Sequence, residues 1–387
     1  MNRSARVATI FALVLAAVLA GGAGTALLGI CGPFTDVSDP SFCNFVIEIF
    51  VLGITTGTTP TTFDPAAPVS RLQMAALLSR TVDATLARGG RRAALDQLWV
   101  TQGAENLGLT VVGSGPVDVR SDGSDIWVAC GGADSVTRVH ASTGRSLESW
   151  SGAAAASSVI PAMGRVVVTG STAPGRLFSI DPGQPAGAVT TVASSLGSFP
   201  GAITFDGGHF WTANQAGSVS IVTPAAAPPW DVTNVTSGFQ APAGILFDSA
   251  NVWVTDAGAG SLVKLDSAGS ILETVTVGSS PRHPAYDGAN IWVPDELSDS
   301  VSVVRAATGA LLRTLTGNAL SHPLAAAFDG QRILVTSPSG DRVSLWKAAD
   351  LTPIGSFSTG AASSPHGACS DGINFWITLG SNQLARF

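Results

Sequence analysis

Charged residues are scarce in this chain. Lys, Arg, Asp and Glu together make up 12% of its 387 residues, about half of the usual share. The 20 basic residues are outnumbered by 27 acidic ones, which gives a net charge of −7. A protein that holds nucleic acid needs a basic surface, so we expect no nucleic-acid partner. The hydrophobic content of 45% excludes a disordered chain, because it can supply a large core.

Motifs of common catalytic centres are absent as well. The sequence has no Gly-x-Ser-x-Gly, no His-Glu-x-x-His, no phosphate-binding loop and no Cys-x-x-Cys. We therefore expect no cofactor and no metal ion. No motif predicts an enzyme.

Long hydrophobic runs are missing beyond the first thirty residues. At the N-terminus, Arg3 and Arg6 precede an apolar run over 7–20 and small residues over 21–26. This order predicts a secretory signal peptide over residues 1–26. The alternative is an uncleaved anchor, because residues 7–30 are just long enough to span a bilayer. We expect a secreted, cell-surface protein with no membrane span after signal cleavage.

Only four cysteines are present. Export places them in an oxidising compartment. Cys31 and Cys43 are twelve residues apart, and a disulfide between them would stabilise the fold by about 3 kcal/mol. Cys130 and Cys369 lie in separate repeats and are predicted to be buried strand residues. Four cysteines allow three pairings, among which the sequence does not choose.

Residues 32–85 differ in pattern from the rest and predict a small helical module. A first helix is expected over Ser41–Leu52, ending at Gly53. A second is expected to begin after Ser70 as its N-cap. Its apolar face would be formed by Leu72, Ala75, Ala76 and Leu78.

This module resembles the S-layer homology module. The resemblance is carried by Phe34-x-Asp36-Val37, Gly53-Ile54-x-x-Gly57, Phe63-x-Pro65 and Val69-Ser70-Arg71-x-x-Met74-Ala75. It implies a module that grips cell-wall polysaccharide or another envelope component, with Arg71, Ser70 and Asp36 as the glycan-binding residues. The arginine of the family's Thr-Arg-Ala-Glu motif is kept, whereas Gln73 replaces the glutamate. A structural or self-association role is the alternative.

A connector over 86–106 leads to seven repeats of about 42 residues over 107–387. Each repeat has an apolar anchor, an Asp five residues before it and a Pro six residues before the Asp, although the second repeat lacks both. Four short strands are expected in each repeat. The anchors are Trp127, Val167, Trp211, Trp253, Trp292, Leu334 and Trp376. Such periods predict a mainly all-β protein, a seven-bladed β-propeller behind the helical module.

The last repeat ends after three strands at Phe387. A strand over 107–113 is predicted to complete it, which would remove an exposed edge. The repeats resemble NHL and YVTN-type propellers, and the streptogramin lyase-like group among them. That resemblance implies magnesium and a catalytic His–Glu set, but no Glu stands beside a His in this sequence.

One face of the propeller is predicted to gather polar residues at the mouth of its channel. The loops before the repeating Pro and after the anchor strand share this face. The predicted ligand-binding residues there are His283, His322, His366, Arg282, Asp256, Asp295 and Asn214. The alternative is an ordinary solvated mouth. The tryptophans are expected to pack between blades.

These observations predict a secreted cell-surface protein. The propeller would be a binding platform for an unidentified protein or small molecule, and the module would associate with the wall or envelope. The alternative function is an extracellular lyase or hydrolase at the channel mouth. The missing catalytic set favours the binding platform.

Overall fold

The computed structural model describes residues 34–39, 42, 46, 49, 54–59, 61–78, 81 and 108–387. The chain divides into two compact units, residues 1–94 and 95–387. The predicted signal peptide over 1–26, Cys31, Cys43 and the linker over 86–106 lie outside the described residues.

No helix within the described ranges is long and apolar enough to cross a membrane.

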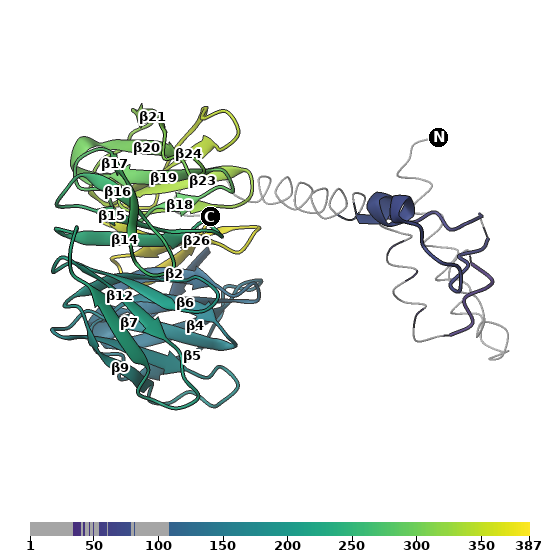
Figure 1. Cartoon of the computed structure of the whole chain (residues 1–387), viewed down its shortest axis with the longest axis horizontal. Helices are drawn as coiled ribbons and strands as arrows, with labels where there is room; N and C mark the ends of the chain where they lie inside the picture. Colours follow the sequence, from purple (N-terminus) through teal and green to yellow (C-terminus); the bar gives the residue numbers. More distant parts are fainter. Residues whose placement is uncertain are drawn as a thin grey trace. The chain divides into compact units, whose positions relative to one another are not determined.

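The second unit is a seven-bladed β-propeller, as the repeats predicted (Figure 1). Each blade is a four-stranded antiparallel sheet. The first four blades consist of β2 (Pro116–Ser121), β3 (Asp125–Cys130), β4 (Ser135–His140) and β5 (Ser146–Ser151); β6 (Ala156–Ala162), β7 (Arg165–Gly170), β8 (Gly175–Ile180) and β9 (Thr190–Leu196); β10 (Pro200–Phe205), β11 (Phe210–Asn214), β12 (Ser218–Thr223) and β13 (Asp231–Val235); β14 (Pro242–Phe247), β15 (Val252–Asp256), β16 (Ser261–Leu265) and β17 (Ile271–Thr276).

The fifth and sixth blades follow the same order, and the seventh takes its fourth strand from the start of the unit. Their strands are β18 (Ala285–Tyr286), β19 (Asn290–Asp295), β20 (Ser300–Arg305) and β21 (Leu311–Thr316); β22 (Ala326–Phe328), β23 (Arg332–Ser337), β24 (Arg342–Lys347) and β25 (Pro353–Ser358); β26 (Pro365–Ser370), β27 (Phe375–Leu379), β28 (Gln383–Arg386) and β1 (Gly108–Val111). Within residues 108–387, single turns of 3-10 helix are η2 (Gly131–Ala133), η3 (Glu296–Ser298) and η4 (Pro338–Gly340).

The repeating Asp and Trp bind each other within the five blades that have a tryptophan anchor. All five anchor tryptophans are fully buried. Each indole Nε1–H donates to Oδ2 of the Asp five residues earlier, over 2.7–2.8 Å. The other oxygen of that Asp accepts N–H groups of the hairpin between the first two strands, as Asp122 Oδ1 does from Ser124 and Asp125. The repeating Asp and Trp residues therefore have a structural role.

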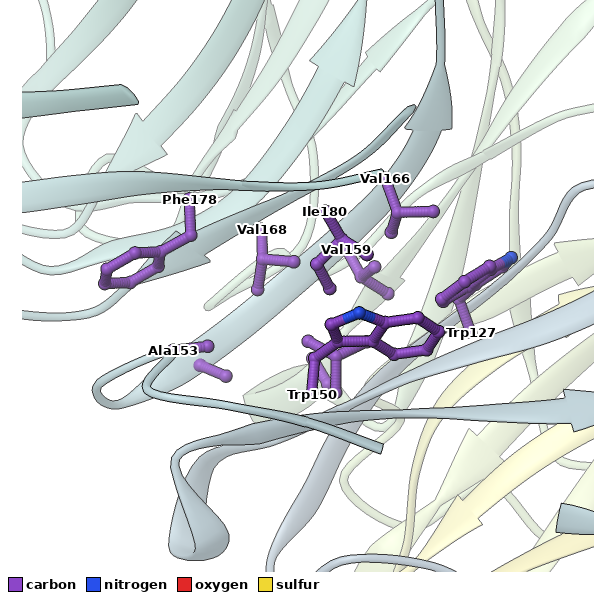
Figure 2. Packing of buried hydrophobic residues seen from close by; sticks show 11 residues of the cluster. Trp127, Trp150, Ala153, Val159, Val166, Val168, Phe178 and Ile180 are labelled. Atoms are coloured by element: carbon purple, nitrogen blue, oxygen red, sulfur yellow. The ribbon is translucent and has the colours of Figure 1, made fainter. Parts of the chain in front are cut away.

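Neighbouring blades bury their apolar faces against one another. Between the first and second blades the rings of Trp127 and Trp150 pack with centroids 5.2 Å apart. Figure 2 shows these rings beside Val159, Val166 and Ile180 from the second blade. The prediction that the tryptophans pack between sheets is confirmed.

Strand β1 pairs antiparallel with β28, with Gly108 opposite Arg386 and Val111 opposite Gln383. Beside this pair, Asn382 Oδ1 accepts the N–H of Gly115 over 2.9 Å. Asp134 and Asp299 make equivalent bonds to the N–H groups of the next blades, at 2.7 Å each. All three residues have positive φ, so a short polar residue in the left-handed region fastens one blade to the next.

The described part of the first unit has a small core. Phe34, Val37 and Val46 are buried and pack against Phe63. The described residues of the first predicted helix, Phe42, Val46 and Ile49, are helical.

A helix over 71–78 follows Ser70. Ser70 N–H donates to Gln73 Oε1, and Gln73 N–H donates to Ser70 Oγ, which confirms Ser70 as the N-cap in a capping box. The prediction that this helix buries its apolar face is wrong, because the residues of that face are exposed. Leu72 is 84% exposed and Leu78 is 60% exposed, and neither belongs to the cluster of Phe34, Val37, Val46 and Phe63.

Candidate functional site

A cavity of about 390 Å³ lies on the propeller axis, where the innermost strands meet. Strands β2, β6, β10, β22 and β26 and the segment before β18 contribute to its wall. Four ionisable side chains line it: Asp118, Arg120, His283 and His366. Its size is within the range of small-molecule sites.

The backbone around this cavity is tightly packed. A β-carbon on Gly244 would lie 2.5 Å from the carbonyl oxygen of Arg282, and one on Gly367 would lie 2.6 Å from that of Val117. Glycine is therefore required at both positions. Register shifts after Pro116 and after Pro365 reorient the residues that follow them.

Asp118 lies on β2 and is held by the second blade. Its Oδ2 accepts the hydroxyl of Ser158 over 2.5 Å and the N–H of Val159 over 3.1 Å. Its Oδ1 has no hydrogen-bond partner among the residues that the structure describes. One carboxylate oxygen is thus fixed and the other is left for the cavity.

Arg120 follows two residues later on the same strand. Side chains alternate along a strand, so Asp118 and Arg120 share one face of β2, and both line the cavity. The guanidinium carries five N–H donors, yet within the described ranges it makes no hydrogen bond and no ion pair. Half-buried arginines elsewhere in the propeller, such as Arg138 and Arg332, bind carboxylates.

His283 lies on the opposite side of the ring of strands. Its backbone is bonded to the sixth blade, donating to the carbonyl of Leu324 and accepting from the N–H of Ala326. The imidazole has no hydrogen-bond partner among the described residues. Burial, with smaller contributions from the cations Arg120 and Arg282, lowers its pKa to about 4, although Asp118 acts in the opposite direction. The ring is therefore neutral at pH 7.

His366 lies on β26 and faces the same cavity. Its Nδ1 lies 2.7 Å from the carbonyl oxygen of Ser364. A carbonyl accepts, so Nδ1 carries a proton. In the neutral ring Nε2 is then an acceptor.

The structure brings together two of the seven predicted mouth residues, His283 and His366. His322 lies outside the cavity: its backbone N–H donates to Asp299 Oδ1, and its ring is half-exposed, 3.8 Å from the same oxygen. Arg282 also lies outside, because its guanidinium pairs with Glu296.

The remaining three are buried within their blades. Asn214 donates to the hydroxyls of Ser218 and Ser220. Asp256 accepts four backbone N–H groups, those of Gln240, Ala241, Gly258 and Ala259. Asp295 accepts from Gly278, Ser300 and Ser302. Burial raises the pKa of Asp295 to about 6, although the two serine hydroxyls lower it.

Two of the predicted glycan-binding residues are used inside the first unit. Asp36 accepts the N–H groups of Phe63 and Asp64 over 2.6–3.1 Å. These bonds, that of Phe63 above all, lower its pKa. Ser70 is occupied as the N-cap. Arg71 is exposed, and no residue that the structure describes is bonded to its guanidinium.

Asp118 and Arg120 are not among the residues predicted from the sequence. A signal for them is present. The first strand of the first blade, Pro-Val-Asp-Val-Arg-Ser, carries two opposite charges on one face. The first strands of the other blades carry no charged residue at these two positions.

The lyase-like resemblance implies magnesium held beside a His–Glu set. Among the described residues, no group of three or more His, Cys, Asp or Glu side chains is placed to hold a metal ion. Asp118 and the two imidazoles line the same cavity but do not form such a group. The residues present therefore do not fit that metal.

Solved structures share the fold at low sequence identity. An inactive variant of virginiamycin B lyase from Staphylococcus aureus, solved with quinupristin, gives a TM-score of 0.62 at 13% identity, over 72% of this chain and 98% of that one. A streptogramin B lyase gives 0.60 at 16% identity, over 74% and 99%. The computationally designed protein Ika8 gives 0.55 at 14% identity, over 70% and 83%. At these identities the likeness establishes the fold alone.

No protein-family model and no curated protein matches the sequence. The propeller part of the predicted resemblance is supported by the fold, and the S-layer homology part stays a prediction.

Proposed function

We propose that the chain is a secreted cell-surface protein in which the propeller is a binding platform and the N-terminal unit associates with the cell wall or another envelope component. The channel cavity carries the proposal. Two of its polar side chains, those of Arg120 and His283, have no partner among the described residues. The guanidinium donors of Arg120 and the imidazole nitrogens of His283 are therefore left for a bound ligand.

The platform is tested on the full mature chain by thermal unfolding with the small-molecule fraction of a cell-wall digest or of spent growth medium. We expect a higher midpoint for the natural chain and a smaller rise for Arg120→Gln. Arg313→Gln, a change at an exposed arginine on β21, is the matched control. If no fraction raises the midpoint, the platform proposal is contradicted.

The association with the envelope is supported by Arg71. It stands exposed at the start of the second helix, and guanidinium donors suit sugar and carboxylate oxygens. Asp36 and Ser70 are engaged within the unit, so Arg71 is the one of the three that is left for a ligand.

This half is tested by co-sedimentation with purified sacculi. The intact chain is compared with a chain that lacks residues 32–85 and with Arg71→Ala, and Arg305→Ala on β20 is the control. We expect the intact chain and the control to pellet and the other two to stay in solution. If all four stay in solution, the envelope half is contradicted.

The second candidate is an extracellular lyase or hydrolase at the channel. It is supported by the likeness to two lyases and by His366, whose Nε2 is free to accept a proton in the neutral ring. Against it, the described ranges contain no hydrogen bond or ion pair between a His and a Glu. Incubation with quinupristin tests this candidate: a new chromatographic peak that His366→Ala abolishes would support it, and unchanged quinupristin would contradict lyase activity on that compound.

A further inference from the structure

The channel cavity holds one basic and one acidic side chain from the same strand, Arg120 and Asp118 of β2. Arg120 is a cation at every physiological pH. Asp118 is a carboxylate whose Oδ2 accepts two hydrogen bonds from the second blade. His283 is neutral at pH 7, because burial lowers its pKa to about 4. At neutral pH the two charges of β2 therefore dominate the cavity, and they sum to zero.

These two charges do not neutralise each other directly. Their α-carbons are two residues apart on one strand, which corresponds to about 6–7 Å. No ion pair within 4 Å joins them in the part of the chain that the structure describes. Each keeps a free bonding position: Oδ1 on Asp118 and the whole guanidinium on Arg120.

The arrangement discriminates between classes of small ligand. A simple anion would bind Arg120 but be repelled by the carboxylate of Asp118. A simple cation would bind Asp118 but be repelled by the guanidinium of Arg120. An uncharged sugar would leave both charges without a counter-ion. A molecule with an ammonium and a carboxylate a few ångströms apart pairs with both.

The rest of the wall suits such a molecule. Val117, Leu324, Ala325 and Ala326 supply apolar surface, whereas His283 and His366 supply imidazole nitrogens that can bond an amide. The volume of about 390 Å³ accommodates a few residues at most.

We propose that the channel is a site for a small zwitterion, an amino acid or a short peptide with free termini, whose carboxylate binds Arg120 and whose ammonium binds Asp118 Oδ1. This ligand class rests on the proposed platform function. The carboxylate would take two parallel N–H bonds from the guanidinium.

The experiment is calorimetric titration of the full mature chain with glycine, glycylglycine, alanylalanine and glycylphenylalanine. Each is used with free termini, N-acetylated and C-amidated. Acetate and N-acetylglucosamine serve as the simple anion and the neutral sugar. We expect at least one compound with free termini to bind, and blocking either terminus to weaken its binding by tenfold or more. The comparison is made on the unaltered protein, so no variant has to fold.

Two variants then assign the ends of the ligand. Arg120→Gln should remove the preference for a free carboxylate and keep the preference for a free amine. Asp118→Asn should do the opposite, and Asn can still accept the two bonds from the second blade. Arg313→Gln and Asp231→Asn, at exposed positions on β21 and β13, should bind as the natural chain does.

The proposal is overturned if no member of the panel with free termini binds, or if blocked members bind equally well. Binding of acetate or N-acetylglucosamine alone would overturn the zwitterion and leave the platform standing. The platform itself is judged by the separate test with the medium and cell-wall fractions.

Discussion

Asp295 and Asn214 occupy the same position in their blades, and each binds two serine hydroxyls of the following strand. Both residues end the second strand and stand opposite the repeating proline, as Asn214 does to Pro200 and Asp295 to Pro281. Asn214 Nδ2 donates to Ser218 and Ser220. Asp295 Oδ2 accepts from Ser300 and Ser302. An equivalent pair of serine hydroxyls is therefore bonded by an amide in the third blade and by a carboxyl group in the fifth.

The comparison predicts that Asp295→Asn stabilises the protein at neutral pH. Burial raises the pKa of Asp295 to about 6, above the ordinary value near 3.9. The folded state therefore binds more protons than the unfolded state between about pH 4 and 6, and the stability of the natural chain rises as pH falls through that window. Asn does not titrate, so the variant should be more stable by about 1–3 kcal/mol at pH 7.5, with the difference closing toward pH 4.

Chemical denaturation between pH 4 and 7.5 measures this effect. The reciprocal change, Asn214→Asp, is the matched control, because it places a carboxyl among Ser218 and Ser220. It should lower stability at pH 7.5 and recover part of the loss at low pH. A loss of more than about 1 kcal/mol for Asp295→Asn at pH 7.5 would show that the ionised carboxylate is the form that the blade stabilises.

His283→Gln should also stabilise the protein, but at low pH, because the pKa of His283 is shifted in the direction that destabilises the natural chain on acidification. The pKa of His283 is lowered to about 4 in the folded state, against about 6.5 when unfolded. The unfolded state therefore binds more protons between about pH 4 and 6.5, and the natural chain loses stability as pH falls through this window. We expect the variant to gain about 2 kcal/mol relative to the natural chain at pH 4, a value reduced because the ring borders the open cavity.

Chemical denaturation between pH 4 and 7.5 also measures the stability gain expected for His283→Gln. Above pH 7 the imidazole is neutral in both states, so the difference between His283→Gln and the natural chain should be constant there. That plateau is the internal control for the packing effect of the substitution. Parallel profiles from pH 7.5 to 4 would contradict a neutral, desolvated His283.

The sequence predicted the propeller because each repeated residue acts on its near neighbours. Asp122 bonds the hairpin two and three residues ahead and the indole of Trp127 five residues ahead. Such contacts recur at fixed spacing, so the seven blades, the buried tryptophans and the N-cap at Ser70 were all predictable.

The candidate site was less predictable, because it depends on contacts between strands. The sequence places Asn214 and Asp295 at the end of the anchor strand, where they could contact a ligand. In the structure their side chains bond serines of the following strand instead. Register shifts after Pro116 and Pro365 decide which neighbouring side chains face the channel. Spacing along the chain does not encode either effect.

Arg332 takes over the role of the missing tryptophan in the sixth blade. That blade has Leu334 at the anchor position, and Arg332 Nε donates to Asp329 Oδ2 over 2.7 Å. The Asp329 side chain is 7% exposed and its partner is 27% exposed. Arg332→Ala would leave a nearly buried carboxylate oxygen without its charged donor, and we expect it to lower the free energy of unfolding by about 1–3 kcal/mol.

Urea denaturation measures the loss. Arg313→Ala, at an exposed arginine of β21, is the control and should change stability by less than about 0.5 kcal/mol. Arg332→Lys retains the charge and should fall between the two. Equal losses for the two alanine variants would contradict the role of Arg332 as a substitute for the indole.

Cys130 and Cys369 are expected to be unreactive thiols in the folded protein. Both are buried, as the sequence predicted, and both are free; they lie on β3 and β26. Burial raises the pKa of both thiols, so neither forms the thiolate that alkylating reagents attack. Iodoacetamide at pH 8 should therefore label the peptides of Cys130 and Cys369 only after unfolding in urea, as read by mass spectrometry.

The same peptide map tests the predicted bridge between Cys31 and Cys43. After digestion with a protease that cuts before Asp36 and Asp39, the two cysteine peptides should appear without reductant as one linked species that iodoacetamide does not label in urea, and reduction should release two labelled peptides. The folded chain treated with iodoacetamide and the chain reduced in urea are the two reference states. Labelling of Cys369 in the folded state would show that the reagent reaches β26. That result would contradict the burial of this thiol beside the channel.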